Sequence, residues 1–152
     1  VMRKSEQHID FDLDLAVSQS KDNVVYYIQY AHARIQRILQ KAQASNLELN
    51  VATAREHANL LTLDTETEIL AKLAAYPEVL VRAANSYEPH QIGNYLKELA
   101  ALFHGWYAQD GIKFIDDQNV TLSQARLLLS SNVQQVLRNG LTLLGVSAPE
   151  SM

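Results

Sequence analysis

The chain has 152 residues, 47% of them hydrophobic and 20% charged, and these proportions exclude a wholly disordered protein. The formal net charge of −4 disfavours a protein that coats nucleic acid or a membrane surface, and no apolar run reaches the roughly 18 residues of a membrane span. Because cysteine is absent, disulfides and thiolate metal sites are impossible, and a reducing, cytoplasmic location is expected.

The first predicted elements are helical. Residues 1–22 form an acidic lead-in, in which 12–17 makes one or two helical turns. A long helix is expected over 23–44, because apolar residues recur every three or four positions and Asp22 or Asn23 can cap its first turn.

The middle of the chain predicts shorter helices. Residues 46–63 are ambiguous and contain a short helix around 53–60. A helix capped by Asp64 or Thr65 then runs to Ala75, and another covers 77–87, since proline suits a first helical turn.

Two further helices complete the chain. The first spans 89–109 and ends before Asp110-Gly111, and 112–119 forms a loop. The last spans 122–144, introduced by a Thr121-x-x-Gln124 capping box. Without repeats or linker composition, the sequence predicts one all-α domain, a bundle of about five to six helices over residues 23–152.

The long helix over 23–44 carries two stripes of side chains at helical spacing. The first is apolar and should face the core: Val24, Ile28, Ala31, Ile35, Ile38 and Ala42. The second, about a quarter-turn away, is aromatic and basic: Tyr27, Tyr30, Arg34, Arg37 and Lys41. Rings and cations in one line suit single-stranded RNA, whose bases stack on aromatic faces while cations meet phosphates.

Two ordinary explanations compete with RNA binding for the second stripe. Tyrosines beside an apolar face are often core-rim residues, and helical Arg and Lys are often simply solvated. A helical protein-interaction module without any RNA role is therefore an alternative, and the acidic net charge favours it slightly.

Two motifs, residues 23–34 and the stretch Leu143-Leu-Gly-x-x-Ala-Pro-Glu-x-Met152, resemble a known family, the arginyl-tRNA synthetases. Asn23 to Arg34 matches Asn-x-x-x-Tyr-x-Gln-Tyr-Ala-His-x-Arg at the start of the first long helix of their C-terminal DALR-type anticodon-binding domain. Residues 143–152 match its Leu-Leu-Gly-x-x-Ala-Pro-Glu-x-Met ending, and the resemblance covers essentially the whole chain. A related class I synthetase, such as the cysteinyl or methionyl enzyme, is the nearest alternative.

The resemblance implies an anticodon-loop-binding domain of arginine–tRNA ligase, which attaches arginine to its tRNA using ATP and magnesium. The family's catalytic His-x-Gly-His element is absent from this sequence. We therefore expect no catalytic residue, cofactor or metal in this chain. We expect residues 1–22 to be a lead-in from a catalytic domain of the same polypeptide, and the chain to be monomeric, to bind arginine tRNA and to be unable to aminoacylate alone.

Site residues come from two sources. The resemblance assigns anticodon contacts to Tyr27, Tyr30 and Met152. The helical stripe adds Arg34 and Arg37 as candidates for the same surface. The five histidines lack zinc-helix spacing, so each is expected to be structural, with His32 making an orienting hydrogen bond.

Overall fold

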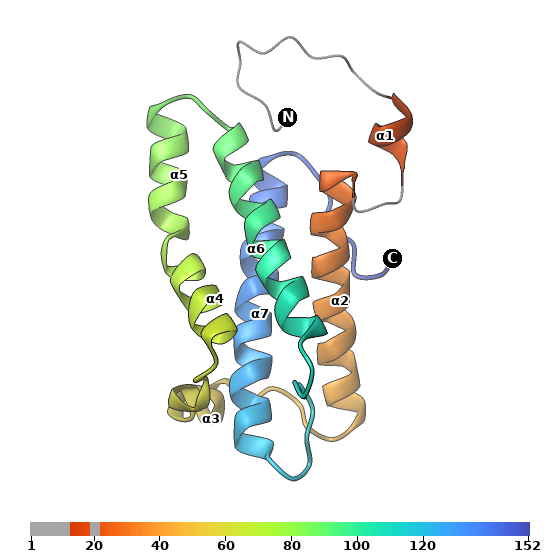
Figure 1. Ribbon diagram of the computed structural model, residues 1–152, viewed down its shortest axis with the longest axis vertical. Coiled ribbons are helices and arrows are strands. Elements are labelled where there is room, and N and C mark those ends of the chain that lie inside the picture. The colour runs from red at the N-terminus through yellow and green to blue at the C-terminus, as the bar shows by residue number, and fades with distance from the viewer. Residues whose placement is uncertain (1–12, 19–21) are drawn as a thin grey trace.

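The computed structural model describes residues 13–18 and 22–152, and over these residues it contains helices and connections but no strand (Figure 1). The predicted all-α class is thereby confirmed. The elements are α1 (Leu13–Val17), α2 (Val24–Ala44), α3 (Val51–Glu56), the 3₁₀ turn η1 (Ala58–Leu60), α4 (Asp64–Ala74), α5 (Tyr76–Asn85), α6 (His90–Ala108) and α7 (Val120–Leu143). Most of the predicted lead-in, residues 1–12 and 19–21, lies outside the described residues.

The helix α7 is the centre of the bundle. It packs against α2, α3, α4 and α6, while α5 packs on α6 (Figure 1). The helices α2 and α6 run in the same direction and α7 runs opposite to both. Among the described residues, no helix is long and apolar enough to cross a membrane.

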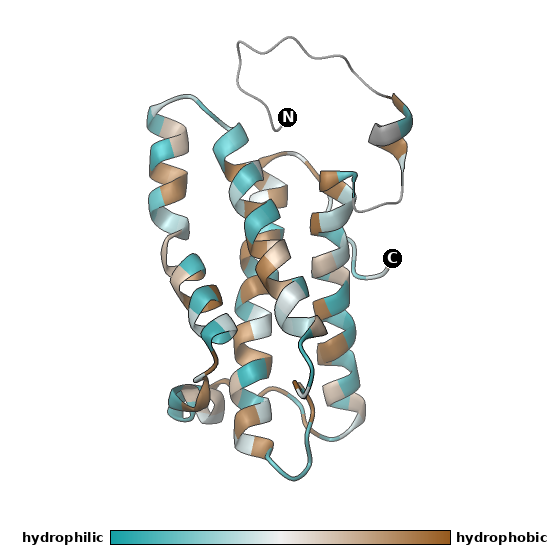
Figure 2. Cartoon of the chain, viewed as in Figure 1, coloured by the Kyte–Doolittle hydropathy of each residue, from teal (hydrophilic) through white to brown (hydrophobic). Residues whose placement is uncertain are grey.

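The predicted core face of α2 is confirmed. Ile28, Ala31 and Ile35 have no exposed surface, Ile38 and Ala42 are nearly as buried, and Val24 is partly buried. Hydrophilic and hydrophobic residues alternate along the long helices, as Figure 2 shows, which is the pattern of an amphipathic bundle. This packing fixes the rotation of α2 and therefore the direction of its second stripe.

Some helix starts agree with the sequence and others do not. Asn23 caps α2, its Oδ1 accepting from the backbone N–H groups of Val25 and Tyr26 at 3.1 and 3.2 Å. The predicted caps of α4 were wrong, because α4 already begins at Asp64 and the Glu66 carboxylate accepts from the Leu63 N–H instead.

The predicted capping box of α7 was also wrong. Asn119 caps this helix, accepting from the N–H of Leu122, so the helix begins at Val120. Gln124 lies too far inside the helix to cap it. It bridges instead to the segment between α2 and α3, donating to the Glu48 carbonyl and accepting from the Asn50 N–H.

An aromatic cluster fixes the loop between α6 and α7. Trp106 is completely buried and lies edge-on to Phe114 with 4.6 Å between ring centroids. Phe103 and Tyr107 also contact Phe114. The loop is therefore held against the end of α6.

A buried ion pair also contacts the loop between α6 and α7. The Arg126 Nε donates to the Glu66 carboxylate at 2.8 Å, with both side chains at most 9% exposed. Arg126 also donates to the Lys113 carbonyl at 3.0 Å. This one guanidinium thus joins α4, α7 and the loop that precedes α7.

Candidate nucleic-acid interface

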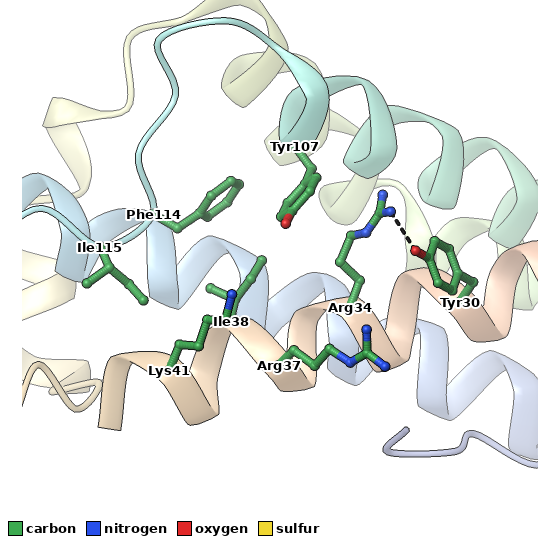
Figure 3. A pocket seen from close by; sticks show the side chains of 8 residues that line it. All are labelled: Tyr30, Arg34, Arg37, Ile38, Lys41, Tyr107, Phe114 and Ile115. Atoms are coloured by element: carbon green, nitrogen blue, oxygen red, sulfur yellow. Dashed lines mark hydrogen bonds between the residues drawn. The ribbon is translucent and has the colours of Figure 1, made fainter. Parts of the chain in front are cut away.

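One face of the protein gathers rings and cations from α2 and α6. Two adjoining hollows open on it, of about 340 and 300 Å³. Tyr30 and Arg34 line both hollows, and Figure 3 shows the side chains around the smaller one. We call this surface the tyrosine–arginine face; its residues are Tyr26, Tyr27, Tyr30, Arg34, Arg37, Lys41, His104, Tyr107, Phe114 and Ile115.

The first hollow is built from aromatic rings. Tyr26 and Tyr30, one helical turn apart, lie almost parallel with centroids 6.3 Å apart and an interplanar angle of 6°. The His104 ring lies 5.7 Å from Tyr30 and 4.7 Å from Tyr27. Flat faces at this spacing offer stacking platforms for planar ligands.

Arg34 lies between two of the rings. Its guanidinium carbon is 4.5 Å from the ring centroid of Tyr30 and 4.5 Å from that of Tyr107. Its Nη2 donates to the Tyr30 hydroxyl at 2.8 Å, and its Nη1 donates to the Nδ1 of His104 at 3.0 Å. Arg34 therefore connects α2 to α6 across the face.

The bond from Arg34 fixes the tautomer of His104. A guanidinium only donates, so the His104 Nδ1 must accept and the ring proton must reside on Nε2, which lies 3.4 Å from the Tyr27 carbonyl oxygen. Burial lowers the pKa of His104 and the charge of Arg34 lowers it further, against the opposing effect of the Tyr27 carbonyl. Burial also raises the pKa of Tyr27, and the positive charge of Arg34 partly offsets this rise.

The second hollow is more cationic. Arg37 and Lys41 lie on its α2 side with exposed side chains, while Tyr107, Phe114 and Ile115 form the opposite wall (Figure 3). The Arg37 Nη2 donates to the main-chain oxygen of Met152 at 2.6 Å. The hollow thus offers positive charge beside apolar surface, and Met152 lies next to it.

The C-terminal segment is tied along α2. Gln29 donates to the Ser147 carbonyl and the His32 Nδ1 donates to the Pro149 carbonyl, both at 2.8 Å. The other ring nitrogen of His32 accepts from the Arg138 Nε at 3.3 Å, and burial lowers the pKa of this histidine. The expected orienting hydrogen bond of His32 is confirmed, and three bonds along α2 hold Met152 near Arg37.

The chain was compared with known proteins. The family model described as the DALR anticodon binding domain matches residues 28–152. The chain belongs to this family. The arginine–tRNA ligase of Acinetobacter baylyi is 74% identical to it over 152 residues, and that of Psychrobacter arcticus is 54% identical over 160 residues.

The match covers only part of these relatives. The whole chain aligns, yet it spans 25% and 26% of the two ligases. The structure of Thermus thermophilus arginyl-tRNA synthetase superposes with a TM-score of 0.81 at 29% identity, over 100% of this chain and 25% of that one. The chain therefore corresponds to about a quarter of the length of each of these longer proteins.

The structure brings all five predicted site residues of this DALR domain to one side of α2. Tyr27, Tyr30, Arg34 and Arg37 line the two hollows, and Met152 contacts Arg37. Sequence reasoning missed five other contributors to the face: Tyr26, His104, Tyr107, Phe114 and Ile115. The available signal was the spacing of His104 and Tyr107, which lie three residues apart on one side of α6.

No metal site emerges in the part of the chain that the structure describes. Over residues 13–18 and 22–152, no group of three or more His, Cys, Asp or Glu side chains could hold a metal ion. Neither hollow of the tyrosine–arginine face is lined by a carboxylate. The face can therefore stack and hydrogen-bond a ligand and attract an anion.

Proposed function

We propose that this DALR domain binds the anticodon loop of an arginine tRNA, as the anticodon-binding part of an arginine–tRNA ligase. The observation that carries the proposal is the tyrosine–arginine face, where stackable rings adjoin exposed cations. The similarity to arginine–tRNA ligases, at 74% identity across the whole chain, supports the choice of tRNA.

The face suits an unstacked RNA loop. Bases splayed from the loop stack on Tyr27, Tyr30 and the rings beside them, each contact contributing about 1–3 kcal/mol. Arg37 and Lys41 meet the adjoining phosphates, and Met152 packs next to the same bases. Because the whole chain carries a net charge of −4, attraction of RNA is local to this face, so affinity should depend only weakly on salt.

In the proposed enzyme, this domain places tRNA rather than performing the reaction. A catalytic domain of the same polypeptide, reached through residues 1–22, uses ATP and magnesium to attach arginine. Binding the anticodon loop positions the distant acceptor end, so anticodon identity influences the chemical step through orientation. The ligase works in the cytoplasm as a monomer, and residues 23–152 alone do not aminoacylate.

The test is binding of a labelled hairpin carrying an arginine anticodon, beside the same hairpin with an exchanged anticodon. Tyr27→Ala and Tyr30→Ala should each weaken binding of the first hairpin roughly 5- to 150-fold, the worth of one stacked base. Tyr87→Ala is the matched control, because this tyrosine is 91% exposed on the α5–α6 turn and lines neither hollow.

Circular dichroism of each variant checks that the helices persist. Equal, weak binding of both hairpins, unaffected by Tyr27→Ala and Tyr30→Ala, would contradict the proposal. That result would favour a protein-interaction module.

A further inference from the structure

The polar atoms of Arg34 are directed at the protein. Its two terminal nitrogens donate to Tyr30 and His104, and its planar group is sandwiched between the Tyr30 and Tyr107 rings. A cation that serves phosphate usually points its donors outward, as exposed Lys41 can do here, and exposed Arg37 gives only its Nη2 to the protein, at Met152. The contacts of Arg34 instead hold the two stacking rings at a fixed separation across α2 and α6.

We propose that Arg34 is a positioning residue of the tyrosine–arginine face, and that it holds the Tyr30 and Tyr107 rings in place only while His104 is uncharged. The inference rests on the proposed function, because the rings it holds are those assigned to RNA bases. Anticodon binding should therefore weaken when His104 takes up a proton.

The hydrogen-bond chemistry supplies the reason. Protonation puts an N–H on the His104 Nδ1, so two donors and two positive charges would meet across the present 3.0 Å contact. The titratable or charged groups that face His104 are Tyr27, Tyr30 and Arg34 from α2, with Tyr107 on the far side of the guanidinium from Tyr30. Arg34 is the charged group that acts on His104, and it opposes protonation.

Loss of the Arg34–His104 hydrogen bond would release Arg34 and the two rings that it holds. The Arg34 side chain would be repelled from α6, and its stacking on Tyr30 and Tyr107 would be lost along with its bond to the Tyr30 hydroxyl. The rings would then sample other rotamers, and a base would have to order them on binding. The consequence is a recognition surface that is organised at neutral pH and loosened in acid.

A salt series separates a positioning role from a phosphate contact. A side chain that neutralises one phosphate contributes about 0.7–0.9 to the slope of log affinity against log salt. Arg37→Gln should reduce the slope by about that amount. Arg34→Gln should weaken binding of the arginine-anticodon hairpin roughly tenfold while leaving the slope unchanged. A slope reduced in Arg34→Gln as in Arg37→Gln would overturn the inference.

A pH series tests the role of His104. Between pH 7.5 and 5.0, hairpin affinity of the unaltered protein should fall, with its midpoint below the ordinary histidine value of 6.5. His104→Asn keeps an acceptor near the position of Nδ1 but cannot titrate in this range, so the fall should disappear. An equal fall in both proteins would contradict the inference.

The free protein gives an answer that does not depend on RNA. Nitrogen NMR at pH 7.5 should find His104 neutral with its proton on Nε2, and the ring signals of Tyr30 and Tyr107 should shift or broaden as His104 titrates. A proton on Nδ1, or ring signals indifferent to the titration, would refute the inference even if the hairpin binds. A protein that shows the expected NMR behaviour but binds no hairpin would refute the proposed function alone.

Discussion

Two buried tyrosines in contact with each other differ in whether the hydroxyl group finds a partner. Tyr76 on α5 and Tyr95 on α6 stack with ring centroids 5.3 Å apart. The Tyr95 hydroxyl donates to the Lys72 carbonyl at 2.7 Å, at the end of α4 where helix carbonyls lack intrahelical partners. The Tyr76 hydroxyl has no hydrogen-bond partner among the described residues. Only the Tyr95 hydroxyl therefore replaces its lost hydrogen bonds to water with a bond inside the protein.

We expect Tyr76→Phe to stabilise the protein and Tyr95→Phe to destabilise it. Removing the unpaired buried hydroxyl of Tyr76 should raise the free energy of unfolding by about 1 kcal/mol. Removing that of Tyr95 should lower it by about 1 kcal/mol, because the Lys72 carbonyl loses its partner. Urea denaturation measures both variants, which serve as each other's control; effects of the same sign would contradict the assignment.

At the scale of helices, the close approach of α6 and α7 depends on a glycine. A Cβ atom built on Gly140 would lie 2.5 Å from the Leu96 Cδ2 and 3.0 Å from its Cγ, and Leu96 is completely buried. Gly105 of α6 differs, since a Cβ there meets nothing within 4 Å. Close packing therefore requires glycine at position 140 but not at position 105.

Gly140→Ala should lower the free energy of unfolding by about 1–3 kcal/mol, the usual cost of overpacking a core. Gly105→Ala, the matched control, should raise it by about 0.5–1 kcal/mol, because alanine favours the helix and fits without contact. Chemical denaturation of the two variants decides the matter. Similar stabilisation by both would mean that Leu96 moves aside at no cost.

The sequence allowed prediction of elements better than of their junctions. The buried side of α2 was predictable from periodicity, because a continuous apolar stripe from Ile28 to Ala42 fixes which side of the helix packs on the core. The start of α7 did not, because Thr121 and Asn119 are both good caps and only the chain path decides between them. Half of the tyrosine–arginine face was predicted, because the α2 stripe follows from local helical periodicity. His104 and Tyr107 were not predicted, because the rotation of α6 in the bundle brings them to the face.

For the molecule as a whole, two histidines link stability to pH. Burial lowers the pKa values of both His32 and His104 from the ordinary 6.5. In the unfolded chain they take up protons near pH 6.5, whereas the folded protein resists protonation to lower pH. Their stabilising contribution is therefore complete above pH 6.5 and is lost as the pH falls through the folded-state pKa values.

The free energy of unfolding should accordingly be level between pH 8 and 7 and decline below about 6.5, before most carboxylates titrate. His104→Asn should remove part of the decline, and a second variant, His32→Gln, should remove another part. Urea titrations at pH 7.5, 6.5 and 5.5 provide the measurement. An unchanged decline in the doubly substituted protein would assign the effect to other groups.

The ties between α2 and the C-terminal segment have a consequence for synthesis. Gln29, His32 and Arg37 bond to residues 118, 117 and 115 positions later. At about 5–20 residues per second, the ribosome needs roughly 6 to 24 seconds to add each partner after the α2 residue that binds it. During that interval these bonds cannot form, so only the helices made earlier hold α2, and Met152 reaches Arg37 after the rings and cations of the tyrosine–arginine face have been made.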